Sequence, residues 1–361
     1  MKKYWKSNFL KKYSEDEDED ENGPSISILV PCYNEEKTIK ICVLSWLNQT
    51  HKADEIIIIN DCSTDKTLDV LDEFKDKITI INLEKNSGNK SFVQEVGLKH
   101  VKTDVFVATD ADTIMDKDFI KRVYRAFQYP NVSAFAGYVK SLKQNWLTAC
   151  REIDYLIGQD LHKVAQHNID FLFVIPGCAG AFRTKIFKEN ISFDHDTLTE
   201  DLDFTYKIHK KKLKIFYDRK AFVYTQDPDK LKSYINQMRR WYCGGWQNFL
   251  KHKKIINKPW VALELSLMYL EGVVFSFIMF LMPLLNLRLA LYLMFFYFLY
   301  GVTLGVYAAI SRKRYDLLFF SPFYIITSYI NAYIFLEQFV KEIFFKKKNM
   351  TWFHPERRGI L

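Results

Sequence analysis

The stretch Glu55-Ile-Ile-Ile-Ile59, which leads into Asp61-Cys-Ser-Thr-Asp65, decides the fold of this chain. A short, unbroken run of β-branched apolar residues predicts a buried strand. The polar residues after it predict a turn and a helix cap, with a helix over 67–74. A strand that leads directly into a helix is the unit from which parallel sheets are built.

The same alternation continues on both sides of this stretch. Before it, 27–30 has the pattern of a buried strand, and apolar spacing predicts a helix over 36–48. After it, strands at 78–83 and 105–108 are separated by a helix at 90–101. We therefore expect an α/β domain with a mostly parallel central sheet that helices cover.

The charge of the chain is unevenly distributed. The 361 residues are enough for one large catalytic domain and a membrane part, and they carry a net charge of +8. Residues 15–21 are all acidic, whereas basic clusters at 251–254, 312–314 and 346–348 stand beside apolar segments. Such clusters are typical of the cytoplasmic, anionic face of a membrane. No basic face with interleaved aromatic residues occurs in the soluble part, so nucleic acid is not an expected partner.

The cysteines and the N-terminal segment carry no targeting or metal signal. None of the six cysteines belongs to a CxxC pair, which argues against a zinc site or a disulfide framework. Residues 1–24 lack an apolar core of signal-peptide length. This segment is expected to be a tail that is basic and then acidic, either disordered or partly a short amphipathic helix on a membrane.

Apolar sequence dominates from about residue 260. Segments 261–285 and 289–310 are long enough to cross a bilayer. The third, 317–345, contains Pro322, Asn331, Glu337 and Lys341, and a tilted, re-entrant or interfacial course stays open for it. An even number of crossings keeps all the basic clusters on one side. Glu264 and Glu271 interrupt the first segment, and acids at that depth usually face protein or water.

Acidic residues follow two of the predicted strands, where ligands of parallel sheets bind. Asp110-Ala-Asp112 comes after the strand at 105–108, and its carboxylates are suitable ligands for Mg²⁺ or Mn²⁺ bound to a diphosphate. Alternatively, these acids cap a helix that begins near Lys117. Asp61 also has two interpretations, as a ligand-binding residue or as an ordinary turn aspartate.

Two further motifs lie between these acids and the apolar segments. Asp201, in Thr199-Glu-Asp201, is a candidate general base that takes a proton from an acceptor hydroxyl, or simply an acid in a first helical turn. In Gln237-Met-Arg-Arg-Trp241, the indole offers a flat face for a sugar ring and Arg240 a planar fork for phosphate. Core packing and a surface ion pair are the alternatives for Trp241 and Arg240.

Taken together and in this order, the motifs resemble the D, DxD, TED and QxxRW signature of the membrane-embedded, processive family 2 inverting glycosyltransferases. Val30-Pro-Cys-Tyr-Asn-Glu35 is similar to the first strand and nucleotide loop of that family. The resemblance implies a GT-A-type domain with a mostly parallel sheet over 25–250. It also implies a small helical membrane domain over 251–345 and a cytosolic C-terminal segment over 346–361.

The resemblance also implies roles for single residues. The donor nucleotide sugar would be bound by residues of the strand ends and of the QxxRW motif: Pro31, Tyr33, Glu35, Asp61, Lys90, Asp110 and Arg240. Asp112, with Asp110, would hold the metal, and Asp201 would be the catalytic base. The acceptor would be bound by Gly177, Cys178, Glu200, Gln237 and Trp241. Trp352 and Arg357 resemble a gating segment of some synthases.

The expected function is therefore transfer of a sugar from a UDP-sugar, first UDP-N-acetylglucosamine, with inversion to form a β-linked polysaccharide. Transfer of a single sugar to a lipid is the alternative, since the membrane part is small. The expected partners are the UDP-sugar, a growing glycan or lipid acceptor, the bilayer, and a small membrane subunit or a second copy of the chain. A multi-pass protein of the plasma membrane with a cytosolic catalytic domain is expected.

Overall fold

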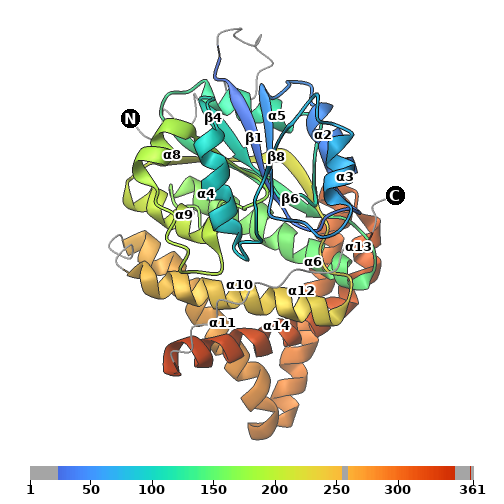
Figure 1. The fold of residues 1–361 in the computed structure, drawn as a ribbon. Coiled ribbons are helices and arrows are strands. Elements are labelled where there is room, and N and C mark those ends of the chain that lie inside the picture. The colour runs from blue at the N-terminus through green and yellow to red at the C-terminus, as the bar shows by residue number, and fades with distance from the viewer. Residues whose placement is uncertain (1–22, 254–258, 346–357, 359–361) are drawn as a thin grey trace. The chain divides into compact units, whose positions relative to one another are not determined.

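The computed structural model describes residues 23–253, 259–345 and 358 (Figure 1). These residues form two compact units. The first comprises residues up to Tyr138, Pro176–Ser192 and Lys211–Val223. The second comprises Val139–Ile175, Phe193–Lys210 and the chain from Tyr224 onward. Each unit is described below by itself.

Four parallel strands form one half of the sheet, in the order β3-β2-β1-β4. They are β1 (Ile26–Cys32), β2 (Glu55–Asn60), β3 (Thr79–Asn82) and β4 (Val105–Ala108). The isoleucines of β2 are fully buried or nearly so, as expected for a strand covered on both faces. All four strands lie where the apolar runs predict them.

The other half of the sheet is mixed in direction. β7 (Gly180–Arg183) pairs antiparallel with β4, and β6 (Val132–Ser141) pairs antiparallel with β7. β8 (Lys214–Thr225) and β5 (Thr113–Met115) complete an eight-stranded order. The fold is thus a GT-A-like sheet with mostly parallel strands at the end where the predicted acids lie, which confirms the predicted fold class.

Helices pack around the sheet of the first unit. They are α2 (Ile39–Leu47), α3 (Thr67–Asp72), α4 (Lys90–His100), α5 (Phe119–Phe127) and α8 (Thr184–Asn190). α4 packs directly on β1 and β2 (Figure 1). A glycine permits this close approach, because a Cβ at Gly97 would lie 2.5 Å from Leu29 and 2.9 Å from Ile59. The helix that carries Lys90 is thereby held against the sheet.

The second unit is helical. It contains α6 (Trp146–Leu156), the π-helical turn η1 (Ile157–His162), α7 (Lys163–Asn168), α9 (Glu200–Lys210), α10 (Leu231–Lys251), α11 (Pro259–Leu285), α12 (Leu287–Arg312), α13 (Tyr315–Phe320), η3 (Ser321–Phe323), α14 (Tyr324–Phe339) and η4 (Val340–Phe344). α6 begins with a capping box in which Asn145 accepts from the backbone of Thr148. α10 packs along α14 (Figure 1). Tyr234, Met238 and Ile334 lie in their shared core.

Three helical stretches of the described chain are long and apolar enough to cross a membrane: Leu263–Leu285, Leu287–Arg312 and Tyr315–Phe344. Many of their large apolar side chains are exposed, including Leu284, Phe296 and Ile310. Such faces are suited to lipid. The third stretch is interrupted by η3, which contains Pro322.

Polar residues in and beside these stretches contact protein, as acids at such depth usually do. Glu264 accepts a hydrogen bond of 2.9 Å from Gln166 of α7. Arg312 pairs with Asp160, and Arg314 pairs with Asp316 at 2.9 Å. Two arginines of the predicted lipid-facing cluster at 312–314 are therefore paired within the second unit. Lys254 of the cluster at 251–254, the whole cluster at 346–348 and the side chain of Glu271 lie outside the described residues. So do residues 1–22 of the N-terminal tail.

Candidate active site

Asp61 stands immediately after β2 and organises the loop that precedes α4. Its two carboxylate oxygens each accept a 2.8 Å hydrogen bond from Ser87, one from the backbone N–H and one from the hydroxyl. Its own N–H donates to the carbonyl of Cys32 at the end of β1, at 2.8 Å. Burial raises the pKa of this carboxyl, and the bonds from Ser87 act in the opposite direction. Asp61 therefore joins the ends of β1 and β2 to the Ser87 loop.

Asp110 lies two residues beyond β4 and forms an ion pair with Lys90. The distance from Nζ of Lys90 to Oδ1 of Asp110 is 2.6 Å, and the two side chains are only partly exposed. Lys90 is the first residue of α4, whose N-terminus Asn89 caps by accepting from the N–H of Ser91 at 3.0 Å. The structure thus joins two residues that the sequence expectation assigned to the donor.

Asp112 is buried, with 4% of its surface exposed. The hydroxyl of Thr38 donates to Glu35 at 2.7 Å and lies 3.4 Å from the carbonyl of Ala111, so it links Glu35 to the DxD segment. Neither aspartate of this segment caps the next helix, because α5 begins at Phe119 and its N-cap is Asp118. The capping interpretation of Asp110 and Asp112 is therefore wrong.

Pro31 and Tyr33, which are also expected to bind the donor, lie in the first unit, as does the expected acceptor loop. Pro31 is paired with Ile59 in the sheet, and Tyr33 follows it at the end of β1. The carbonyl of Cys178 accepts a 3.0 Å hydrogen bond from Thr109, which holds the loop with Gly177 beside β4. We call Asp61, Lys90, Asp110 and Asp112 the donor half-site.

The second unit contains the other half of the predicted residues. α9 begins at Glu200, so Asp201 lies in its first turn, together with other acids that favour the helix N-terminus. Oδ1 of Asp201 accepts from the adjacent N–H of Leu202 at 2.8 Å, which ties the direction of the carboxylate to the local backbone. Glu200 is buried, with 8% of its surface exposed.

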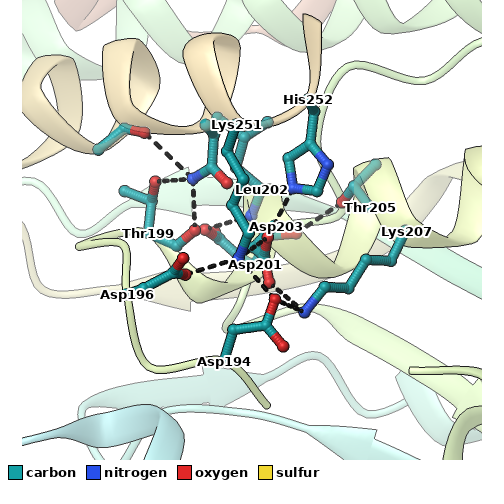
Figure 2. A network of polar contacts seen from close by, with 12 residues as sticks. Asp194, Asp196, Thr199, Asp201, Leu202, Asp203, Thr205, Lys207, Lys251 and His252 are labelled. Atoms are coloured by element: carbon teal, nitrogen blue, oxygen red, sulfur yellow. Dashed lines mark hydrogen bonds and ion pairs between the residues drawn. The ribbon is translucent and has the colours of Figure 1, made fainter. Parts of the chain in front are cut away.

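A network of charged groups surrounds Asp203 in the same turn (Figure 2). One carboxylate oxygen lies 2.6 Å from Nε2 of His252 and 2.9 Å from Lys251, and the other lies 2.6 Å from Lys207. Burial alone would raise the pKa of Asp203, but the bonds from His252, Lys207 and Lys251 outweigh it and lower this pKa. Asp203 is therefore held as a carboxylate, and it anchors α9.

Gln237, Arg240 and Trp241 lie on α10. The guanidinium carbon of Arg151 is 4.3 Å from the ring centroid of Trp241, so one face of the indole stacks on this arginine. The side-chain oxygen of Gln237 is buried and has no hydrogen-bond partner among the described residues, which suits a residue that accepts from a bound molecule. We call Asp201, Gln237 and Trp241 the acceptor half-site. Arg240, which is expected to bind the donor, lies on the same helix as Gln237 and Trp241.

Arg151 of α6 was not among the residues expected from the sequence. Its side chain is 8% exposed and pairs with Asp154 at 3.1 Å and with Asp227 at 3.8 Å. Its guanidinium also lies 4.6 Å from the ring centroid of Tyr155. The hydroxyl of Tyr324, in α14, donates to Asp154 at 2.9 Å. Arg151 therefore connects the indole of Trp241 with the third apolar stretch.

The donor half-site has the chemistry that a divalent cation requires. Carboxylate oxygens are hard ligands, and Asp110 and Asp112 present them one residue apart beyond a strand. In the described part of the chain, no group of three or more His, Cys, Asp or Glu side chains could hold a metal ion. Two carboxylates fit a cation whose other ligands are phosphate and water oxygens.

The fold, with acids just beyond its parallel strands, is the one expected of a glycosyltransferase. The model of the family described as "Glycosyltransferase like family 2" matches residues 24–244, which is more than half of the chain. The chain belongs to this glycosyltransferase family. A mannosyltransferase from Pyrobaculum calidifontis, in complex with GDP-mannose and Mn²⁺, has the same fold, with a TM-score of 0.65 and 18% identity over 96% of this chain and 94% of that one.

Curated relatives are polysaccharide synthases by name. The poly-β-1,6-N-acetyl-D-glucosamine synthase of Staphylococcus epidermidis is 26% identical over 331 residues, which are 91% of this chain and 71% of the relative. A synthase of the same name from Staphylococcus aureus is 28% identical over 230 residues, 63% of this chain and 56% of the relative. The chain thus spans only part of the length of each.

Proposed function

We propose that this glycosyltransferase transfers N-acetylglucosamine from UDP-N-acetylglucosamine and extends a β-linked polysaccharide, with the 1,6 linkage named in its relatives. The observation that carries the proposal is the ion pair of Lys90 with Asp110 next to the buried Asp112. The positively charged Lys90 lies with Asp110 and Asp112 beyond β4, at the edge of the sheet where ligands of such folds bind.

In the donor half-site, Asp61 and Lys90 recognise different parts of the nucleotide sugar. The Asp61 carboxylate accepts hydrogen bonds, so it is suited to a donor on the uracil ring. Lys90 carries its charge at the N-terminus of α4, and both features favour a diphosphate. Pro31, Tyr33 and Glu35 form the wall of the uridine pocket in this proposal.

Asp112, with Asp110, would hold Mg²⁺ or Mn²⁺. When bound, this cation neutralises charge on the diphosphate and so makes UDP a better leaving group. Lys90 and Arg240 supply further positive charge to the departing UDP. Mn²⁺ in the structurally similar mannosyltransferase complex supports the class of cation.

In the acceptor half-site, Asp201 is the general base. Its carboxylate takes the proton of an acceptor hydroxyl, whose oxygen forms the new bond to the anomeric carbon. The bond from that carbon to the diphosphate oxygen breaks, and UDP leaves with the electron pair. Attack opposite to the leaving group turns an α-linked donor into a β-linked product.

Trp241 would support the sugar at the end of the acceptor. An indole face is a good surface for the apolar face of a pyranose ring, and Arg151 already fixes the orientation of that indole. Gln237 would accept a hydrogen bond from the same sugar, and Glu200 with the loop of Gly177 and Cys178 would complete the acceptor site. Repeated transfer would require the product to move on after each addition.

We place the chain in the plasma membrane as a multi-pass protein with a cytosolic active site, supported by its three apolar stretches. The bilayer, a small membrane subunit or a second copy of the chain are the proposed partners. Trp352 and Arg357, the predicted gating residues, lie outside the described residues, and their role stays a prediction, as do the domain boundaries.

The test is to incubate purified protein in detergent or nanodiscs with a panel of labelled UDP-sugars and MgCl₂ or MnCl₂. UDP release should be fastest with UDP-N-acetylglucosamine, and the product should be a polymer whose linkage NMR can assign. A product with a single sugar on a lipid would contradict the proposal that the enzyme makes a polymer. Absence of UDP release with every donor, from folded protein, would contradict the transferase itself.

A further inference from the structure

Five residues beyond the QxxRW motif share one face of α10 and its C-terminal end. They follow the spacing i, i+3, i+4, i+7 and i+8, which places side chains on one side of a helix: Gly244, Gln247, Asn248, Lys251 and His252. All five contact or closely approach the segment 194–203, which contains the start of α9 and the proposed base. Figure 2 shows Lys251 and His252 beside this segment. We call this set the α10 clamp.

Asn248 holds Thr199, the residue just before α9. Its side-chain amide donates to the backbone carbonyl and to the hydroxyl of Thr199, each at 3.0 Å, and Asn248 is fully buried. The same carbonyl accepts the N–H of Asp203 at 3.3 Å, which is the first hydrogen bond of the helix. Asn248 therefore determines the position of the backbone two residues before Asp201.

Gly244 sets the distance between α10 and this segment. A Cβ at this position would lie 2.4 Å from the hydroxyl oxygen of Thr199 and 2.6 Å from its methyl group. Such distances are far inside van der Waals contact, so any side chain would push Thr199 away. At the neighbouring Gly245 the nearest atom to a Cβ is the hydroxyl of Tyr269, at 3.6 Å, which is ordinary contact.

Contacts on both sides of Asp201 complete the clamp. Before it, the side-chain oxygen of Gln247 accepts from the N–H of Leu198 at 3.1 Å. After it, Lys251 and His252 hold Asp203 at 2.9 Å and 2.6 Å. Lys251 also reaches Asp196 at 2.6 Å. The backbone from 196 to 203 is thus attached to one rigid helix at several points.

We propose that the α10 clamp positions the catalytic base, so that Gly244, Gln247 and Asn248 are positioning residues for Asp201. The inference rests on the proposed role of Asp201 as base. The carboxylate of Asp201 accepts from the next N–H of its own helix, so its direction follows the backbone that the clamp holds. Small displacements of a reacting group cost large factors in rate. The clamp connects α9, which carries the base, to α10, which carries the QxxRW motif.

The decisive experiment compares Gly244→Ala with Gly245→Ala. The two substitutions are chemically identical and adjacent, but only the first displaces Thr199. UDP release is measured against UDP-N-acetylglucosamine concentration, and the thermal midpoint is measured on the same samples. We expect Gly244→Ala to lower kcat by about tenfold to a hundredfold, with the KM for the donor within about twofold of wild type. Gly245→Ala should retain both constants.

Asn248→Ala provides a second route in case Gly244→Ala does not fold. It removes the two bonds to Thr199 without adding bulk, and it should lower kcat by about tenfold with donor KM unchanged. Asn190→Ala is its matched control, since Asn190 donates to a backbone carbonyl of α8 at 2.9 Å in the first unit. A purely structural role would lower the thermal midpoint and the yield but leave kcat per folded molecule intact.

The proposal is overturned if both folded variants, Gly244→Ala and Asn248→Ala, keep the kcat of wild type. It is also overturned if Gly245→Ala loses as much kcat as Gly244→Ala. A wild-type protein that releases no UDP is a different failure, because it contradicts the proposed function and not the clamp. The wild-type assay, which is run first, therefore separates the two.

Discussion

The donor half-site lies at the ends of neighbouring strands, whereas the acceptor half-site is assembled by helices that are far apart in the sequence. Lys90 and Asp110 meet because α4 and β4 are parts of one strand-helix repeat. Trp241 meets Arg151 only because α10 packs near α6, about ninety positions away. A strand end positions a residue through backbone hydrogen bonds, but a helix surface positions it through side-chain packing. Substitutions distant from the chemistry should therefore affect the acceptor half-site more.

The strongest test of this comparison removes one acid from each half-site. Asp201→Asn keeps the shape of the side chain but cannot accept a proton, and Asp112→Asn would halve the anionic ligands for the proposed metal. Each should lower transfer by at least about a hundredfold in an assay of UDP release. Asp116→Asn, close to Asp112 in the sequence, is the control and should retain activity. A fully active Asp201→Asn protein would refute its assignment as the base.

Lys90→Ala tests the donor half-site alone. Loss of the ammonium group of Lys90, which pairs with Asp110 at 2.6 Å, should weaken binding of the diphosphate. The donor KM should rise by about tenfold or more. Lys99→Ala, an exposed residue at the other end of α4, is the matched control. Isothermal titration with UDP should give the same ranking. Equal affinity in both variants would remove Lys90 from the site.

Arg151→Lys tests whether packing positions the acceptor half-site. Lysine keeps the charge opposite Asp154 but lacks the planar group that stacks on Trp241. We expect about threefold to tenfold slower elongation and shorter products, with donor KM unchanged. Product length is measured by gel or size-exclusion chromatography. The exposed Arg219→Lys serves as control. Unchanged product length would mean that the indole needs no support from Arg151.

Titration of Glu152, on α6 beside Arg151, should have a smaller effect, which is visible in the pH dependence of folding stability. Burial raises its pKa from 4.5 to about 7, although the N–H of Ser141 and the charge of Arg314 act against this. The folded protein then binds the proton more tightly than the unfolded chain, so stability falls as pH rises from about 4.5 to 7.

In the wild-type protein this loss should lower the free energy of unfolding by at most about 3 kcal/mol between pH 5 and pH 8. Glu152→Gln should abolish the loss. Thermal midpoints of wild type and variant in detergent, measured across that range, test the difference. Identical pH dependence of the two proteins would show that Glu152 does not titrate as its buried position indicates.

The sequence was sufficient to place the predicted donor residues just beyond strands, because the signals for those strands are local. The apolar run of β2 predicts a strand from neighbouring residues, and Asp61 follows it directly. The order of the parallel strands and the positions of α4 and β4 follow from the same repeat. The antiparallel β7 could not be predicted in this way, since its pairing with β4 joins residues about 75 positions apart.

The acceptor half-site was only partly predictable. Asp201 and Trp241 belong to short sequence motifs that can be recognised locally. In the structure, Asp201 lies on α9 and Trp241 on α10. Arg151 has no such signal, because its partner is Trp241 and an arginine in an amphipathic helix is ordinary. The α10 clamp does have a signal, the helical spacing of Gly244, Gln247 and Asn248. Its meaning depends on Thr199, which only the packing of α9 on α10 reveals.

The π-helical turn η1 has a consequence for the tolerance of this chain to insertions and deletions. An extra residue within one turn rotates everything after it by about 100° relative to a regular helix. In this register Asp160 meets Arg312, and Gln166 meets Glu264. Deletion of one residue within Ile157–His162 would restore a regular helix and turn Gln166 away from α11. The contacts of η1 and α7 with α12 and α11 therefore depend on the number of residues in the turn as well as on their identity.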